Sequence, residues 1–180
     1  MFQKILVAID TSALAKHVFD EALFLAKTNT VSLMLLHALS GEEQGNPNMP
    51  ILFRQDYYPY PMMSKKTQEF NQEQWEDLEK QGLELLQSYA EEATAAGVST
   101  EFIQSPGNPG QTICKLASTW GADLIVVGRQ GLSGLSELAL GSVSNYVLHN
   151  APCSVLTMQH ISKMNTESAQ DESSRVSASD

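Results

Sequence analysis

The chain has 180 residues, which is the size of one globular domain or of one domain with a tail. Hydrophobic residues make up 42% of it, enough to form a core, so a chain that is disordered throughout is excluded. The formal net charge of −10 argues against a protein that binds nucleic acid or anionic lipid through bulk electrostatics. That charge still permits one local anion site made of backbone amides.

Two features indicate the compartment. Cys114 and Cys153 have neither zinc-like nor CxxC spacing, which favours a pair of reduced thiols. The apolar run at residues 5–9 is too short for the hydrophobic region of a signal peptide, and Asp10 follows it directly. No apolar run reaches membrane-spanning length. We therefore expect a soluble, cytoplasmic protein with no membrane and no nucleic acid among its partners.

Short, wholly apolar segments alternate along the chain with segments of helical periodicity. Such apolar segments are typical of strands that are covered on both faces of a sheet. The predicted strands are residues 5–9, 31–39, 98–104, 123–127 and 153–158. The predicted helices are residues 14–27, 67–96, 111–120 and a short one that ends near Asn150.

This alternation predicts the fold class. Five apolar strands separated by four helices indicate a parallel sheet with helices on both faces, and right-handed crossovers restrict it to a single doubly wound α/β domain. We expect the domain at residues 1–160, with a long inserted loop at residues 41–66. The remaining residues, 161–180, are Ser-rich and acidic with almost no apolar side chains, and they predict a disordered tail.

In doubly wound folds, ligands bind beyond the carboxyl ends of the strands, where the strand order reverses. Gly128 and Gly131 follow the fourth predicted strand, and Gly141 and Ser142 stand where the next helix begins. Glycine lets the backbone approach a ligand, and a helix start presents free N–H groups and a positive dipole end. Hydroxyls of Ser142 and Ser144 would add donors. The segment predicts a phosphate site; the alternative is that the glycines only make turns and Ser142 only caps the helix.

Asp10 has two possible uses. It follows the first predicted strand, so it suits either the N-cap of the next helix or a pair of ribose hydroxyls. Because Thr11 or Ser12 is able to supply the cap instead, we favour the ribose role. Arg129 either reaches a terminal phosphate or points to solvent. The sequence has no GxxxxGK[ST] motif and no evident catalytic triad, so we expect no catalytic residues and at most weak ATP hydrolysis.

The sequence resembles the universal stress proteins, in the branch that carries an ATP-binding glycine signature. Gly128-x2-Gly131-x9-Gly141-Ser142 matches that signature, and residues 4–10, 121–128 and 147–156 are also similar to the family. The resemblance covers about residues 2–159. It implies a five-stranded parallel sheet of order 3-2-1-4-5.

The resemblance also implies a ligand and the residues that hold it. The ligand would be ATP or AMP, with or without Mg²⁺. Ala8 and Ala38 would line the adenine slot, and Asp10 would bind the ribose hydroxyls. Val127 and Gly128 would pass under the ribose and the α-phosphate, followed by Arg129. The phosphates would be held by Gly131, Gly141, Ser142, Val143 and Ser144.

The last predicted strand, residues 153–158, lies at an edge of a sheet with that order. It contains no proline and no charge that would prevent pairing with another chain. The family resemblance likewise implies a homodimer through this strand. We therefore expect a nucleotide-responsive homodimer in stress response or signalling, acting on an unknown protein partner. The alternative is a dimeric adaptor of the same fold that works without nucleotide.

Overall fold

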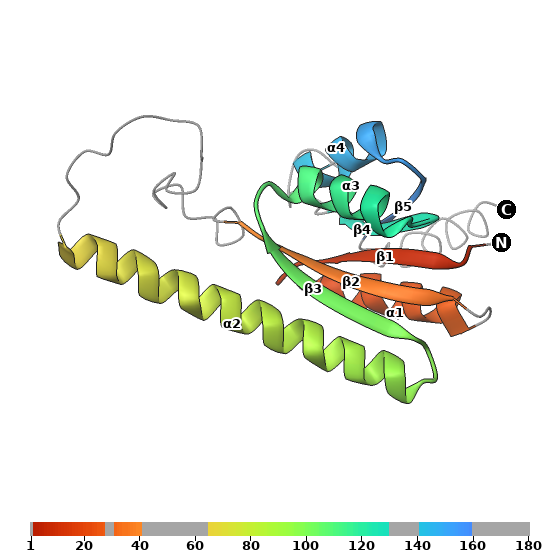
Figure 1. Cartoon of the computed structure of the whole chain (residues 1–180), viewed down its shortest axis with the longest axis horizontal. Helices are drawn as coiled ribbons and strands as arrows, with labels where there is room; N and C mark the ends of the chain where they lie inside the picture. Colours follow the sequence, from red (N-terminus) through yellow and green to blue (C-terminus); the bar gives the residue numbers. More distant parts are fainter. Residues whose placement is uncertain (1, 28–30, 41–64, 130–140, 160–180) are drawn as a thin grey trace, which may run out of the picture.

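The computed structural model describes residues 2–27, 31–40, 65–129 and 141–159 (Figure 1), and for residues 65–72 and 74 it describes the backbone alone. The expected tail at residues 161–180 and almost all of the expected loop at residues 41–66 lie outside these ranges. No helix in the described ranges is both long enough and apolar enough to cross a membrane.

The five strands form one sheet in the order β3-β2-β1-β4-β5, and every neighbouring pair is parallel. This confirms the predicted fold class and strand order. The strands are β1 (Lys4–Ile9), β2 (Ser32–Leu39), β3 (Thr100–Pro106), β4 (Leu124–Arg129) and β5 (Ser154–Gln159). Their carboxyl ends therefore meet at one end of the sheet, on the left in Figure 1.

Within the described part of the chain, two helices cover each face of the sheet (Figure 1). Helices α1 (Ala15–Lys27) and α2 (Lys65–Ala95) lie on one face, and α3 (Pro109–Trp120) and α4 (Ser142–Asn150) lie on the other. Helix α3 begins two residues before its predicted start. The cause is local, because Pro109 suits the first turn and Asn108 Oδ1 accepts a hydrogen bond from the Gln111 N–H at 3.2 Å.

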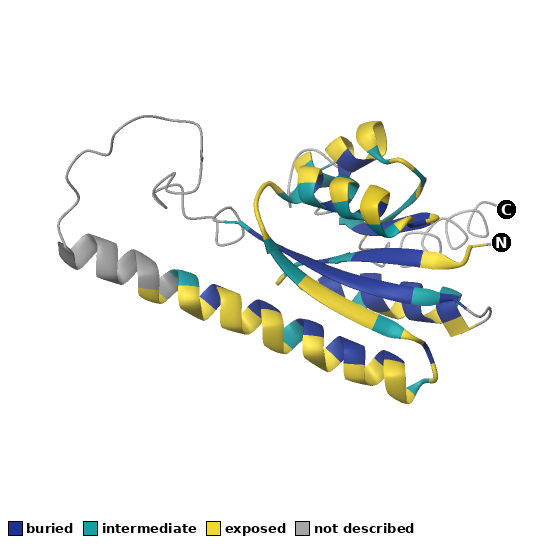
Figure 2. Ribbon diagram, viewed as in Figure 1, coloured by how far each residue is buried: buried dark blue, intermediate teal, exposed yellow. Residues whose placement is uncertain are grey.

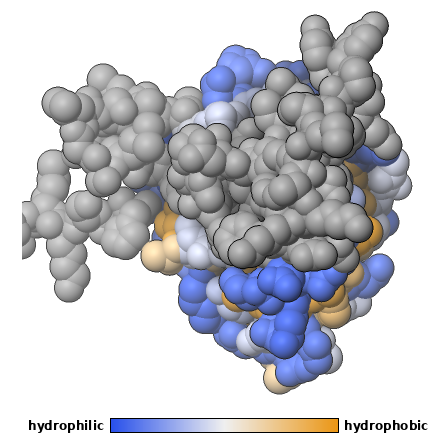
Figure 3. Space-filling model, turned by 90° about the vertical axis from the view of Figure 1, so that its left-hand side faces the viewer, coloured by the Kyte–Doolittle hydropathy of each residue, from blue (hydrophilic) through white to orange (hydrophobic). Residues whose placement is uncertain are grey.

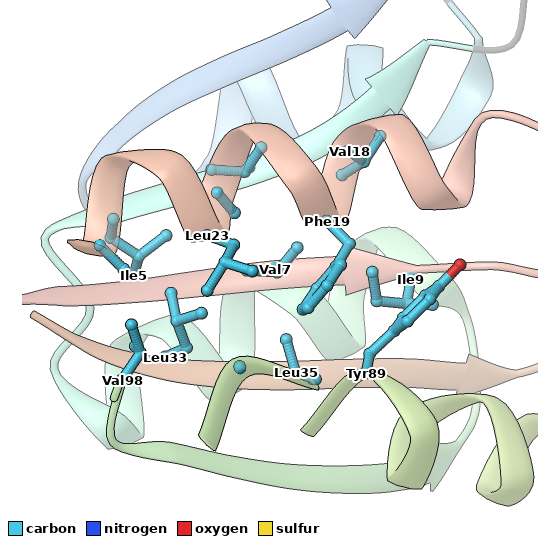
Figure 4. Packing of buried hydrophobic residues seen from close by; sticks show 14 of the residues in the cluster. Ile5, Val7, Ile9, Val18, Phe19, Leu23, Leu33, Leu35, Tyr89 and Val98 are labelled. Atoms are coloured by element: carbon cyan, nitrogen blue, oxygen red, sulfur yellow. The ribbon is translucent and has the colours of Figure 1, made fainter. Parts of the chain in front are cut away.

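The central strands are buried on both faces, and their alternating side chains enter two separate cores (Figure 2). On the α1–α2 side, Val7 and Leu35 pack among residues that include Phe19 and Tyr89. The Phe19 and Tyr89 rings stack with centroids 4.5 Å apart and join α1 to α2 across this core (Figure 4). On the α3–α4 side, a smaller core includes Leu6, Leu36, Ile113, Ile125 and Val147. Each fully buried side chain of this kind contributes about 1.5–3 kcal/mol, which fixes the strand ends in place.

His37 on β2 is fully buried. Its Nδ1 lies 2.8 Å from Nε2 of Gln104, the residue opposite it on β3. Gly82 of α2 lies directly over this pair, and a Cβ at that position would collide with both side chains. The close approach of α2 to the β2–β3 side of the sheet therefore depends on Gly82.

Candidate functional site

A pocket of about 220 Å³ lies at the carboxyl ends of β1, β2 and β4, next to the first turns of α3 and α4. Figure 3 views the molecule from this end, where the visible described surface is mostly hydrophilic with smaller hydrophobic patches. The pocket is lined by Ala8, Ile9, Asp10, Leu14, Val18, Leu36, Ala38, Ser40, Pro109, Ile113, Val127, Gly128, Gly141, Ser142, Val143 and Ser144. It is the topological switch point, because β1 has β2 on one side and β4 on the other.

The part of the pocket at the end of β2 is apolar. Ala8 on β1 stands opposite Leu36 on β2, and Ala38 lies two residues farther along the same strand face. Pro109 and Ile113, on the first turns of α3, line the same pocket. The alanine side chains are small, so these residues are suited to the two faces of a flat ring. Both Ala8 and Ala38, which the family resemblance assigns to an adenine slot, therefore line this part of the pocket.

Asp10, just after β1, is oriented by Ser12. Its Oδ1 accepts hydrogen bonds from the Ser12 N–H at 3.1 Å and from the Ser12 hydroxyl at 2.6 Å. The Leu14 N–H donates to Ser12 Oγ at 3.3 Å, so it is the Ser12 hydroxyl that binds the turn leading into α1. Within the described residues, Asp10 Oδ2 has no hydrogen-bond donor, and Asp10 lines the pocket. Its carboxylate is thus fixed in direction and keeps acceptor capacity for a ligand.

The amino end of α4 forms the third part of the pocket. Gly141 is its N-cap, and no side chain caps the N–H groups of the first turn from that position. Ser142, Val143 and Ser144 follow, and all three line the pocket. In an α-helix the first N–H groups have no partner within the helix, and they carry the positive end of the dipole. This turn is therefore able to bind an anion without a basic side chain.

The hydroxyl of Ser144 has a different partner from the one expected. It donates to the Gly141 carbonyl oxygen at 3.0 Å, and the Asn145 N–H donates to the same oxygen at 2.9 Å. Ser144 is also almost completely buried. The hydroxyl thus stabilises the first turn of α4, and the group that Ser144 retains for a ligand is its backbone N–H.

The absence of a side chain at Gly128 matters for packing against α1 as well as for the expected ligand. A Cβ at Gly128 would stand 3.1 Å from Leu14 Cδ2 and 3.2 Å from Val18 Cγ2, so the missing side chain leaves room for the α1 side of the pocket. Close packing between strand and helix is therefore a second reason for a glycine here, beside the expected approach of a ligand. Gly128 and its neighbour Val127 do line the pocket, as predicted.

Arg129 does not line the pocket in the described part of the chain, although we expected it among the ligand-binding residues. Its Nη1 donates to Gln159 Oε1 at 3.0 Å, which links the ends of β4 and β5. The reason is its position in the register, because Arg129 stands opposite Gln159 on the neighbouring strand. Gly131 lies outside the described residues.

Several lining residues were not predicted. Ser40 and Leu36 share the two-residue spacing of Ala38, so strand periodicity was a usable indication for both. Leu14 directly precedes α1 and Val18 lies in its first turn. The two residues are one helical turn apart, and both line the pocket. Pro109 and Ile113 are brought in by the packing of α3 beside β2, which local sequence patterns do not specify.

The cysteines do not belong to the site. Cys114 and Cys153 are free thiols at the edge of the α3–α4 core, and neither lines the pocket. Burial raises the pKa of both thiols. A raised pKa lowers the thiolate fraction, so these groups are packing residues rather than activated nucleophiles.

Comparison with known proteins gives one family. The sequence model of the universal stress protein family matches residues 1–159. Universal stress protein Sll1388 from Synechocystis is 36% identical over 159 residues, which cover 88% of this chain and 99% of that protein.

Two solved structures share the fold. The structure of the hypothetical protein MJ0577 superposes with a TM-score of 0.67 at 24% identity, covering 89% of this chain and 97% of that one. A universal stress protein family protein from Arabidopsis thaliana with AMP bound superposes with a TM-score of 0.55 at 22% identity. That match covers 93% of this chain and 99% of the other.

Proposed function

The chain belongs to the universal stress protein family, and from that premise we propose that it binds an adenine nucleotide, ATP or AMP, as a nucleotide-responsive stress or signalling protein. One observation carries the proposal. An apolar slot, an oriented carboxylate and a helix amino terminus lie side by side at the ends of β2, β1 and β4. Adjacent strands are about 4.8 Å apart, so these features follow one another as base, ribose and phosphate do in a nucleotide.

Each part has a defined role in this proposal. Ala8 and Ala38 hold the base, Asp10 accepts hydrogen bonds from the ribose hydroxyls, and the first turn of α4 binds the phosphates. Val127 and Gly128 pass under the ribose and the α-phosphate. A related fold holds AMP in the Arabidopsis protein, which supports the same ligand class here.

The proposal includes no metal site made by protein side chains. In the described ranges, no three His, Cys, Asp or Glu side chains gather as a metal site. We propose that any Mg²⁺ enters with the nucleotide, coordinated by phosphate oxygens and water, since this ion usually keeps several waters and binds together with substrate phosphates.

Hydrolysis of the bound nucleotide should be slow. Phosphoryl transfer depends on positive charge placed at the transferring group. The lining residues include no Lys or Arg, residues 130–140 contain none in the sequence, and Arg129 is hydrogen-bonded to Gln159. We expect turnover well below about 1 s⁻¹, the lower end of ordinary enzyme rates.

We also propose that the protein is a homodimer through β5. This strand is at the edge of the sheet, and its four central residues are only half-buried in the single chain. Val155 and Leu156 pack against opposite cores, so a second copy of β5 would extend the sheet and cover both faces. A nucleotide-independent dimeric adaptor is the competing function, and it would need β5 but not the pocket.

One experiment separates the two functions. The protein is purified without added nucleotide and denatured by heat, and the released small molecules are separated by chromatography. Nucleotide binding predicts an adenine nucleotide in the supernatant, or tight uptake of one by the stripped protein. If the protein neither releases an adenine nucleotide nor takes one up, the result favours the adaptor.

A further inference from the structure

The hydroxyl of Ser40 is a buried polar group without a partner. Among the described residues, its Oγ is the one buried side-chain oxygen or nitrogen that makes no hydrogen bond. Buried hydroxyls in proteins nearly always have a hydrogen-bond partner, because burial removes their hydrogen bonds to water and leaving these unreplaced costs free energy. Ser40 also lines the pocket, so a ligand in the pocket is the natural source of the missing hydrogen bond.

Ser40 lies at the end of the pocket assigned to the base. It follows β2 directly and continues the alternate positions Leu36 and Ala38, which line the same pocket. The other polar side chains of the pocket, Asp10 and the serines of α4, lie at the ends of β1 and β4. The residues around the proposed base are otherwise apolar, so Ser40 carries the polar side chain at that end of the pocket.

We propose that Ser40 Oγ hydrogen-bonds a polar atom on the edge of the nucleotide's purine base and so contributes to base selection. The inference rests on the nucleotide-binding function proposed above. A hydroxyl donates one hydrogen bond and accepts two, so it suits an edge that carries an amino group and ring nitrogens, as adenine does. The alanines and Ile113 then hold the faces of the ring, and Ser40 reads its edge.

The test is a set of double-mutant cycles between the protein and the base. The dissociation constant of AMP is measured for the parent protein, for Ser40→Ala and for Ser105→Ala. Ser105 is the matched control, because it stands opposite Ala38 on β3 and does not line the pocket. The same proteins are then titrated with analogues that each lack one polar atom of the base: purine riboside 5′-monophosphate and 1-deaza-, 3-deaza- and 7-deaza-AMP.

We expect Ser40→Ala to weaken AMP binding about 3- to 10-fold, the usual effect of one lost hydrogen bond, and Ser105→Ala to leave it unchanged. For one of the analogues the loss should disappear, because that analogue already lacks the atom that Ser40 contacts. Without ligand, Ser40→Ala should keep the thermal midpoint of the parent, since its hydroxyl makes no hydrogen bond to any of the described residues.

The results that overturn the inference are distinct from those that overturn nucleotide binding. If the parent binds AMP and Ser40→Ala binds it equally well, Ser40 does not contact the base. If Ser40→Ala weakens AMP and all four analogues by the same factor, Ser40 acts on the protein rather than on the base edge. If the parent binds no AMP, the proposed function itself fails, and this inference fails with it.

Discussion

Gly110 on α3 lies so close to Tyr146 on α4 that a Cβ at Gly110 would stand 2.7 Å from Tyr146 Cδ1. The two helices therefore meet at a position where any side chain would have to displace an aromatic ring. Helix α3 contributes Pro109 and Ile113 to the base end of the pocket, and α4 contributes its first turn to the phosphate end. The Gly110–Tyr146 contact thus sets the spacing between the two ends.

The first prediction follows from this contact. Gly110→Ala should push Tyr146 and the start of α4 away from the sheet, weaken AMP binding about tenfold or more, and lower stability by about 1–3 kcal/mol, as overpacking does. Calorimetric titration and thermal unfolding measure the two effects. The double variant Gly110→Ala/Tyr146→Ala removes the collision and should recover part of the affinity. Equal affinity in the parent and Gly110→Ala would show that α3 and α4 do not set the pocket's length.

The second prediction concerns Asp10. Hydrogen bonds to a charged group contribute about 1.5–3 kcal/mol, so Asp10→Ala should weaken AMP about 10- to 100-fold. It should have little effect on the 2′,3′-dideoxy analogue, which has no ribose hydroxyls to lose. Ser12→Ala is the matched control, because it removes the hydroxyl that binds the turn before α1 and one contact to Asp10 but keeps the carboxylate. An equal loss for both nucleotides would assign Asp10 a structural role.

The third prediction is a pH dependence. Asp123 Oδ2 accepts hydrogen bonds from the backbone N–H groups of Gln3 at 2.8 Å and Lys4 at 2.9 Å, and joins the start of β1 to the loop before β4. These two hydrogen bonds lower the pKa of the Asp123 carboxyl below its ordinary value of 3.8. Since the folded state favours the charged form, this stabilisation is present above the unfolded pKa and is lost as the pH falls through the folded pKa.

Asp123→Ala should therefore lower the free energy of unfolding at neutral pH and have a smaller effect at the lowest pH where the protein remains folded. Urea denaturation across this range provides the measurement. Asp123→Asn keeps an acceptor oxygen without the charge, so its loss at neutral pH should be smaller than that of alanine. A loss from Asp123→Ala that is the same at both ends of the pH range would contradict the role of the carboxylate's charge.

The fourth prediction concerns assembly. Proline in place of Val155 removes a backbone N–H from β5, so Val155→Pro should turn the proposed homodimer into a monomer. Val155→Ala keeps the N–H and should stay dimeric, as should a chain without residues 163–180. Sedimentation velocity distinguishes the species, and circular dichroism checks that each variant is folded. A monomeric parent at micromolar concentration would refute pairing through β5.

The sequence was sufficient to predict the sheet and the end at which the pocket lies. Wholly apolar strands, helical spacing and the rule for crossovers define a doubly wound fold, and the ends of its parallel strands must meet. The strand order itself was implied by the resemblance to the universal stress proteins, and this order brings the ends of the strands that carry Asp10, Ala38 and Val127 together. Whether Asp10, Thr11 or Ser12 caps the following helix was left open by the sequence, and the structure shows that the Ser12 hydroxyl binds both Asp10 and the turn leading into α1.

What the sequence could not predict depends on contacts between distant elements. A Cβ at Gly128 would lie in tight contact with Leu14 and Val18 on the α1 side of the pocket, and a glycine motif alone does not show which neighbour uses the space. Arg129 bonds to Gln159 because β5 lies beside β4, thirty residues later in the chain. That the buried Ser40 hydroxyl has no hydrogen-bond partner among the described residues is likewise a property of the packed structure, and the residue pattern does not indicate it.

The fifth prediction concerns the central claim, that the end of β4 and the start of α4 hold the phosphates of a nucleotide. Gly141 has φ −57° and ψ 152°, a conformation that any residue adopts, so Gly141→Val adds side-chain volume at the phosphate end without backbone strain. The measurement is calorimetric titration of nucleotide-stripped protein with AMP and ATP. We predict one site per chain with a dissociation constant of about micromolar order for the parent, and no binding heat for Gly141→Val. No heat and no thermal shift with the parent, or equal binding by Gly141→Val, would contradict the account.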